Sequence, residues 1–297
     1  MTKAAIDTAA MANRLFTRSI LLFRSAPRQA YCVLRHNHVN SRRMGLRRAG
    51  SQGETHVTDF VFLHGGGQGG WVWDETIAAI STQSGGAARC LALDVPGCGG
   101  KRGRDTAGYD LAAITAELVA DSEAVGMRNV VLVGHSQAGT LMPGMAALRP
   151  GLFSRLVFVS CIAPDPGLTV IGMTASRMHG GNHPFSDETL SLRERYRAMF
   201  CNDMAPPDAE AFLDKLGPDQ WPAVSYTHCE WLYDHLASMP VSYVLCLDDA
   251  ILPLDWQHFF AKRLHARSTP RIDAGHQAMN TRPQALAEIL LAEAAGE

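Results

Sequence analysis

The 297-residue chain lacks the cysteine spacing that disulfide frameworks and zinc sites require. Its seven cysteines are an odd number, are scattered along the chain and form no Cys-x-x-Cys pair. Paired, closely spaced cysteines are the usual sequence mark of both kinds of site. We therefore predict free thiols in a reducing compartment and no bound metal.

Long apolar runs and a large excess of charge are also absent. No uninterrupted apolar segment approaches the ~18–20 residues that span a bilayer, and the formal net charge is only -2. These two absences predict neither a membrane nor a nucleic acid as a partner. The chain is 46% hydrophobic, which is enough for a sizeable core, so global disorder is excluded and one large domain is expected.

Positive charge is concentrated in residues 1–50, which contain Lys3 and nine arginines against a single acid, Asp7. This segment therefore carries about +9 and leaves about -11 for the rest of the chain. An arginine-rich, acid-poor stretch is typical of a mitochondrial presequence, but a flexible arm or a start near Met44 explains it equally well. We expect a disordered extension over residues 1–50 and a folded domain over 56–297, cytoplasmic unless the presequence is real.

Continuous apolar runs predict buried strands at six places, with helix-like segments between them. The expected strands are residues 57–63, 88–94, 129–134, 155–163, 240–249 and a weaker 268–275, and the expected helices are 72–80, 109–126, 140–149 and 282–295. Unbroken apolar strands that alternate with helices are typical of an α/β fold with a mostly parallel, doubly wound sheet. Residues 165–238 interrupt the alternation and are rich in Met and aromatic residues, which predicts a helical lid insertion over one sheet edge.

One motif favours a different function. Residues 64–70 read HGGGQGG, and the next expected strand ends at Asp94, which together resemble the fingerprint of a dinucleotide-binding oxidoreductase. However, Trp71 and Trp73 crowd the start of the following helix, and Asp94 leads into another loop. None of the six tyrosines has Lys four residues later, as a short-chain dehydrogenase would need. The dinucleotide reading remains a remote alternative, and we expect no cofactor.

The sequence GHSQAG at residues 134–139 follows an apolar run directly and places Ser136 at its turn. A serine at a sharp strand-to-helix turn, flanked by small residues, has the pattern of a nucleophile elbow, which exposes the hydroxyl above the sheet. A serine hydroxyl attacks only when a base takes its proton and an acid orients that base. The pattern therefore predicts a His and an acid elsewhere at the same sheet edge.

Both partners follow in the expected order. Asp248 and Asp249 end a buried strand, and His276 precedes the last helix. We predict a triad of Ser136, one of these two acids and His276, with Asp165 as a further alternative acid.

Other chemically capable residues near this expected site are interpreted as structural. Two of the histidines stand where an expected strand meets the glycine-rich loop or the elbow. Two of the cysteines stand in loops at strand ends, and most buried cysteines act simply as small hydrophobic residues. These residues are His64, His135, Cys98 and Cys161.

Several stretches together resemble the α/β-hydrolase superfamily, most closely the branch of plant methylesterases, hydroxynitrile lyases and small bacterial esterases. They are FVFLHGGGQGGWVW, LALDVPGCG, VVLVGHSQAG, VLCLDDAILPLDWQ and IDAGHQAMNTRPQALAEIL, within residues 57–295. The resemblance implies that Ser136 is the nucleophile, Asp249 the orienting acid and His276 the base. It also implies an oxyanion hole made by the backbone N–H groups of Gly66 and Gln137.

One departure from this family narrows the expected chemistry. The resemblance implies that the lyases carry Thr after the oxyanion-loop His and Lys after the catalytic His, whereas this chain has Gly65 and Gln277. We therefore expect a serine hydrolase that cleaves a small or medium, largely apolar carboxylic ester, a small-molecule substrate, through an acyl-enzyme on Ser136. A C–C bond hydrolase, a lactonase, a thioesterase, or a ligand receptor that retains the triad remain alternatives.

Overall fold

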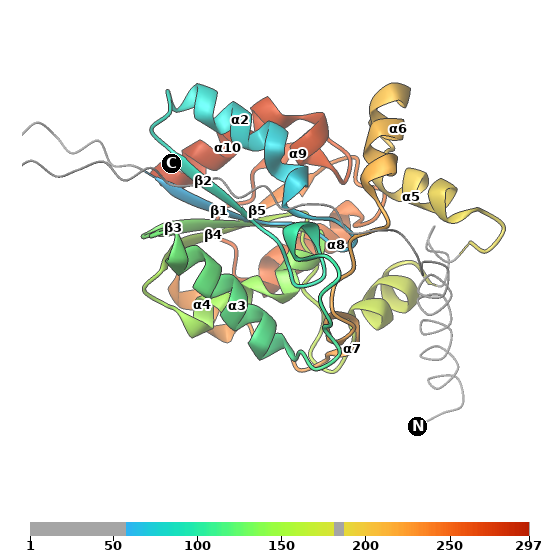
Figure 1. The fold of residues 1–297 in the computed structure, drawn as a ribbon, viewed down its shortest axis with the longest axis horizontal. Coiled ribbons are helices and arrows are strands. Elements are labelled where there is room, and N and C mark those ends of the chain that lie inside the picture. Colours follow the sequence, from blue (N-terminus) through green and yellow to red (C-terminus); the bar gives the residue numbers. More distant parts are fainter. Residues whose placement is uncertain (1–57, 181–186, 297) are drawn as a thin grey trace, which may run out of the picture. The chain divides into compact units, whose positions relative to one another are not determined.

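The computed structural model describes residues 58–180 and 187–296. The extension expected over residues 1–50 lies outside these ranges, and so do residues 181–186 of the expected insertion. The described residues form a central sheet with helices on both of its faces (Figure 1).

The sheet contains six strands whose neighbours all run parallel. The strands are β1 (Asp59–Leu63), β2 (Arg89–Leu93), β3 (Val130–His135), β4 (Phe153–Val159), β5 (Val241–Cys246) and β6 (Arg271–Ile272). Their order is β2-β1-β3-β4-β5-β6, so the chain first moves outward from β1 and then returns to its other side at β3. A doubly wound sheet of this kind has its ligand crevice at the carboxyl ends of the two strands where the direction reverses, here β1 and β3.

Helices cover both faces of the sheet, as the apolar strands require. The helices outside the insertion are α2 (Asp74–Gln83), α3 (Leu111–Ala124), α4 (Met142–Leu148), α8 (Leu254–Arg263), α9 (Ala278–Thr281) and α10 (Pro283–Ala295). α2 packs with α10 on one face, and α3 packs with α4 on the other (Figure 1). Every residue of β1, β3 and β5 is buried, which confirms the predicted α/β fold. Among the described helices, none is long and apolar enough to cross a membrane.

Residues 165–238, which lie between β4 and β5, are called the insertion. It contains η4 (Gly172–Met178), α5 (Leu192–Phe200), α6 (Pro206–Lys215), α7 (Val224–Thr227) and η6 (Asp234–Ser238). α5 begins with a capping box in which Ser191 and Glu194 satisfy each other's backbone N–H groups. α6 begins with Pro206, whose fixed φ suits a first helical turn. The described part of the insertion therefore contains several short helices.

Several elements differ from the sequence prediction, and among the strands the differences are largest for β6 and β4. β6 has only two residues, which pair with Leu245 and Cys246 of β5, because the preceding Pro270 has no N–H for the ladder. Before it, Ser268 forms no more than an isolated bridge to Ser242. β4 ends at Val159 and not at residue 163, because Ser160 has a φ of +39°, which no strand residue adopts. The early end of β4 turns residues 160–162 toward the loops that follow β3 and β5.

Candidate active site

Ser136 stands directly after β3 in a left-handed backbone conformation, with φ of +54°. This conformation costs a non-glycine residue about 1–2 kcal/mol, so the surrounding contacts must enforce it. The flanking glycines show how tight the turn is. A side chain on Gly134 would collide with Met142, and one on Gly139 would collide with the carbonyl oxygen of Ile162. Ser136 therefore has the strained backbone and the close packing expected of a nucleophile elbow.

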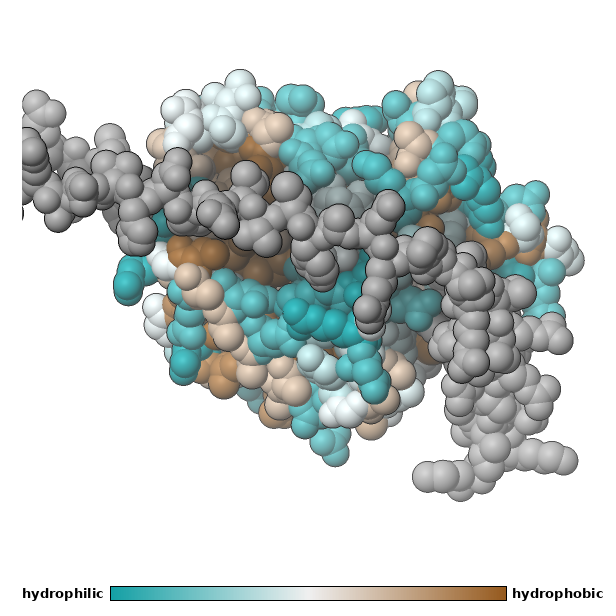
Figure 2. Space-filling model, in the orientation of Figure 1, coloured by the Kyte–Doolittle hydropathy of each residue, from teal (hydrophilic) through white to brown (hydrophobic). Residues whose placement is uncertain are grey.

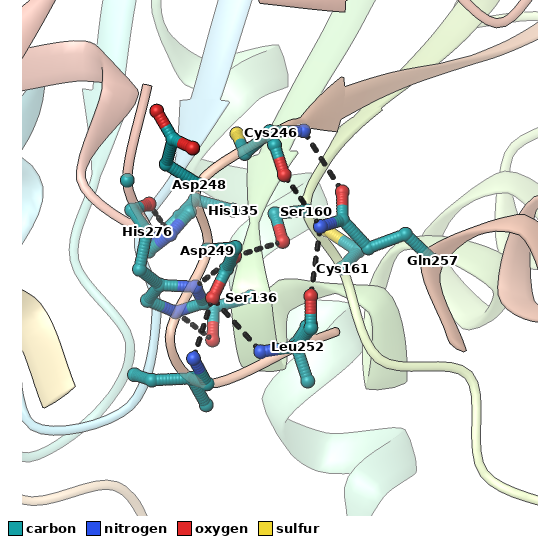
Figure 3. Close-up of polar contacts among 12 residues, drawn as sticks. His135, Ser136, Ser160, Cys161, Cys246, Asp248, Asp249, Leu252, Gln257 and His276 are labelled. Carbon is teal, nitrogen blue, oxygen red and sulfur yellow. Dashed lines mark hydrogen bonds and ion pairs between the residues drawn. The ribbon is translucent and has the colours of Figure 1, made fainter. Parts of the chain in front are cut away.

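The structure brings Ser136, His276 and Asp249 into one hydrogen-bonded series (Figure 3). His276 Nε2 lies 2.9 Å from Ser136 Oγ, and His276 Nδ1 lies 2.6 Å from Asp249 Oδ2. The side chains of His276 and Asp249 are fully buried. The imidazole can therefore accept the serine proton on one nitrogen while the carboxylate fixes the tautomer at the other.

The loop that carries Asp249 is held from two sides. The amides of Ile251 and Leu252 donate to Asp249 Oδ1 over 2.7 and 2.8 Å. The buried side chain of Gln257 on α8 accepts from the Cys246 amide over 2.8 Å and donates to the carbonyls of Cys246 and Leu252 (Figure 3). Sequence reasoning missed Gln257, because one glutamine in a helix carries no signature of such a contact.

The two alternative acids have other partners. Asp248 is exposed and points away from His276 (Figure 3), and its backbone carbonyl accepts a hydrogen bond from Asn202. Asp165 pairs with Arg177 and Arg263. Of the three acids considered from the sequence, Asp249 is the one that contacts His276.

The glycine-rich loop after β1 packs against the elbow. A Cβ atom on Gly65 would come within 3.1 Å of Ser136 Cβ, and a side chain on Gly66 would collide with the side chain of Gln137. The two residues expected to supply the oxyanion-hole amides are therefore neighbours at the carboxyl ends of β1 and β3. This is where donors must lie to meet the charge that develops when Ser136 attacks a carbonyl.

His64 and His135 support the two loops from within the core. The Val95 amide donates to His64 Nε2 over 3.1 Å, and His64 Nδ1 lies 2.8 Å from the Gly65 carbonyl oxygen. His135 Nε2 lies 2.9 Å from the carbonyl oxygen of His276, to which it donates. Burial lowers the pKa of both rings, and His276 lowers that of His135 further. Both rings are therefore neutral, in agreement with a structural role.

The two cysteines near the site are buried thiols. Burial raises the pKa of Cys98 and of Cys161, which keeps both protonated. The Cys161 thiol donates to the Gly134 carbonyl over 3.1 Å. Both residues therefore contribute packing at the end of the strands, as the sequence indicated.

Aromatic residues of the insertion contact His276 and the loops that follow β1 and β3. The Tyr226 hydroxyl is hydrogen-bonded to the side chain of Gln137 and lies beside Gly66. The Trp221 ring meets the His64 ring edge-on with centroids 5.7 Å apart, and the Phe200 ring lies 6.0 Å from that of His276. The aromatic content of the insertion was the only sequence signal for these contacts, and it did not indicate which residue lies where.

The glycine motif and Asp94 have structural partners. Asp94 accepts hydrogen bonds from the amides of Gly70 and Gly100 over 2.7 and 2.8 Å, which joins the loops after β1 and β2. Its carboxylate is thus used within the protein, which gives no support to a ribose-binding role. Within residues 58–180 and 187–296, no group of three or more His, Cys, Asp or Glu could hold a metal ion.

Comparisons with known proteins agree with this architecture. Residues 60–289 match the model of the Alpha/beta hydrolase family. A pyrethroid hydrolase from Sphingobium wenxiniae is 24% identical over 251 residues, covering 79% of this chain and 86% of the relative. Polyneuridine aldehyde esterase from Rauvolfia serpentina is 21% identical over 273 residues, covering 78% of this chain and 94% of the relative.

Among solved structures, an extracellular alpha/beta-hydrolase from a Paenibacillus species superposes with a TM-score of 0.66 at 21% identity. The superposition covers 80% of this chain and 98% of that one, and that protein is described as sharing structural and functional homology with tobacco salicylic acid binding protein 2. At this level of identity, the likeness shows the shared fold.

Proposed function

Because the chain belongs to the alpha/beta hydrolase family and to its branch of small esterases, we propose that it is a serine hydrolase with Ser136 as nucleophile. Its substrate is a small or medium, largely apolar carboxylic ester. The observation that carries this proposal is the series from Ser136 Oγ to His276 and on to Asp249, with hydrogen-bond distances of 2.9 and 2.6 Å. A hydrolase outside the serine class would not need a strained, partly exposed serine at this point.

The mechanism follows from the hydrogen-bond directions. His276 Nε2 takes the proton of Ser136 as its oxygen attacks the ester carbonyl, and Asp249 stabilises the imidazolium that forms. The amides of Gly66 and Gln137 stabilise the oxyanion of the tetrahedral intermediate. His276 then protonates the leaving alcohol, and the acyl group stays on Ser136. In the second half, His276 activates a water molecule that releases the acid and restores the serine.

An apolar substrate is supported by the surroundings of the triad. Phe200 lies against His276, and Trp221 and Tyr226 lie against residues of the loops after β1 and β3. Two arginines of α5, Arg193 and Arg197, are instead paired with Glu210 on the outer side of the insertion. Figure 2 shows this outer surface as largely hydrophilic. Two of the matched relatives are named as a pyrethroid hydrolase and a polyneuridine aldehyde esterase, which supports ester cleavage.

The same contacts support the insertion as a lid over residues 58–164 and 239–296 of the hydrolase domain. Tyr226 and Trp221 each contact a residue of the oxyanion loop or the elbow. A substrate bound at Ser136 would lie close to these side chains, so the proposal assigns to the insertion a part in the selection of acyl and alcohol groups.

The test is hydrolysis of a chain-length series of p-nitrophenyl esters by the wild type, Ser136→Ala and Ser154→Ala. Ser154 lies near the start of β4, at the sheet edge opposite Ser136. Its hydroxyl donates only to backbone carbonyls, so Ser154→Ala is a matched control. We expect rapid turnover by the wild type and by the control, and a rate at least about a hundredfold lower for Ser136→Ala.

Equal rates for Ser136→Ala and the wild type would overturn the proposal. No turnover of any ester by a wild type that a fluorophosphonate still labels would favour the receptor, C–C hydrolase and lactonase readings over the esterase. The chain-length preference of an active wild type measures the depth of the acyl pocket.

A further inference from the structure

A second serine touches the triad from the side opposite the nucleophile. Ser160 follows the last residue of β4, is fully buried, and donates from its hydroxyl to Asp249 Oδ2 over 2.5 Å (Figure 3). The same oxygen faces His276 Nδ1 at 2.6 Å. Ser160 and His276 therefore bind one carboxylate oxygen between them.

This contact completes the set of donors around the carboxylate. Oδ1 accepts from the amides of Ile251 and Leu252, whereas Oδ2 accepts from the two side chains of Ser160 and His276. A carboxylate oxygen has room for about two such donors. The Ser160 hydroxyl is thus the one fixed donor that holds Oδ2 in place while the imidazole of His276 changes its charge during the reaction.

The backbone of Ser160 is held in a conformation that serine rarely adopts. Its φ is +39°, and its amide donates to the carbonyl of Val244 on β5 over 3.1 Å. A left-handed non-glycine residue costs folding free energy, and such residues concentrate at functional sites. Glycine would relieve the strain but would remove the hydroxyl, so stability alone does not explain a serine here.

The residues after Ser160 connect the acid to the nucleophile. The amide of Ile162 donates to the carbonyl oxygen of Ser136 over 3.0 Å, and the Tyr243 hydroxyl donates to the carbonyl of Cys161 over 2.7 Å. The three residues 160–162 therefore contact the elbow, β5 and the acid loop at once. A shift of this segment would move Asp249 relative to Ser136.

We propose that Ser160 is a positioning residue, which orients the Asp249 carboxylate and through it the imidazole of His276. The proposal rests on the proposed serine-hydrolase function and adds a fourth side chain to its hydrogen-bonded series. Ser160 does not touch the reacting atoms, so its loss should lower kcat and leave KM for the ester nearly unchanged.

The experiment compares Ser160→Ala, Ser160→Gly and a matched control, His265→Gly, with the wild type. His265 is an exposed residue after α8 that also has a positive φ, +57°, so its change to glycine relieves the same kind of strain away from the site. The measurements are kcat and KM with a p-nitrophenyl ester, the melting temperature, and the low-field proton NMR signal of the His276–Asp249 hydrogen bond.

We expect both Ser160 variants to lose kcat by about ten- to a hundredfold, with KM within about twofold and with the low-field signal shifted or broadened. Ser160→Gly should melt no lower than Ser160→Ala, because glycine accepts the positive φ. His265→Gly should keep wild-type kcat. A Ser160→Gly protein that is less active but not less stable separates positioning from folding.

Wild-type kcat and an unchanged low-field signal in folded Ser160→Gly would overturn the proposal, and so would a loss of activity that only follows the loss of folded protein. If Ser160→Ala does not fold, Ser160→Gly decides alone. A wild type that neither hydrolyses esters nor reacts with a fluorophosphonate would instead refute the proposed function, and the role of Ser160 with it.

Discussion

At the residue scale, two adjacent carboxylates after β5 have different surroundings. The Asp249 side chain is fully buried against His276, whereas Asp248 is exposed. We expect Asp249→Asn to lower kcat by about 10⁴-fold, because an amide stabilises neither the required His276 tautomer nor the imidazolium. The measurement is kcat for p-nitrophenyl ester hydrolysis, with circular dichroism to verify the fold.

Asp248→Asn is the matched control for this prediction, since it makes the same chemical change one residue earlier. It should retain kcat within about threefold of the wild type, as expected for a surface position. A large loss of kcat in Asp248→Asn together with an active Asp249→Asn would show that Asp248, and not Asp249, orients His276.

The residues of the candidate site could be predicted from the sequence to different degrees. Ser136 and His276 stand in patterns that the chemistry itself requires, a sharp turn and a loop before the last helix. Asp249 could be chosen over Asp248 only through family resemblance. Ser160 could not be found, because its contact with Asp249 spans 89 residues and a serine after a strand is usually an ordinary turn residue.

At the element scale, α8 holds the acid loop through one side chain. Gln257 is fully buried and makes three hydrogen bonds to the backbone of Cys246 and Leu252. We expect Gln257→Met, which is similar in size but cannot make these bonds, to destabilise the protein by about 2–5 kcal/mol because buried backbone groups lose their partners. It should also lower kcat, since Asp249 lies inside the loop.

Gln83→Met is the control for this prediction, because Gln83 also bonds a backbone carbonyl, that of Gln284, but is exposed on α2. Thermal unfolding should show a change of less than about 0.5 kcal/mol for this control. Similar melting temperatures for Gln257→Met and Gln83→Met would contradict a stabilising role of the loop contacts.

The elements themselves were predictable to different degrees for a physical reason. The central strands bury both faces, so their apolar runs are continuous and β1, β3 and β5 were found at nearly their observed positions. β6 was expected over residues 268–275 but has only two residues, because Pro270 cannot donate a ladder hydrogen bond. α8 was not predicted, because it begins directly after the acid loop and mixes polar with aromatic residues.

At the scale of the whole described domain, Asp219 joins the insertion to the segments that follow β1 and β2. Its carboxylate is fully buried and accepts from the Gly99 amide over 2.7 Å, from the Trp71 indole over 3.2 Å, and from Arg102 over 2.5 and 2.7 Å. The neighbouring Gln220 amide donates to the Gly97 carbonyl. The Asp219 carboxylate therefore holds the insertion against these segments through its negative charge. Protonation of the carboxylate would weaken its hydrogen bonds and its ion pair with Arg102.

The pKa of Asp219 determines when this contact stabilises the fold. Burial alone would raise this pKa, but Arg102, the Gly99 amide and the Trp71 indole together lower it below its usual value. A carboxyl whose folded-state pKa is lowered contributes stability that is present above its unfolded pKa, about 3.9, and is lost as the pH falls through the folded pKa. Acid should therefore loosen the insertion.

We expect Asp219→Asn to lower stability by about 1–3 kcal/mol at pH 7, mainly because the buried N–H donors of Gly99 and Trp71 lose a charged acceptor. Arg102 is half exposed, so its ion pair adds less. The difference in melting temperature from the wild type should shrink as the pH falls below about 4.

Asp234→Asn changes an exposed acid of the same insertion and therefore controls for the loss of one negative charge. The measurement is thermal unfolding of the wild type, Asp219→Asn and Asp234→Asn between pH 3 and pH 7. If the melting temperature of Asp219→Asn stays below that of the wild type by the same amount over this range, the Asp219 charge does not hold the insertion in place.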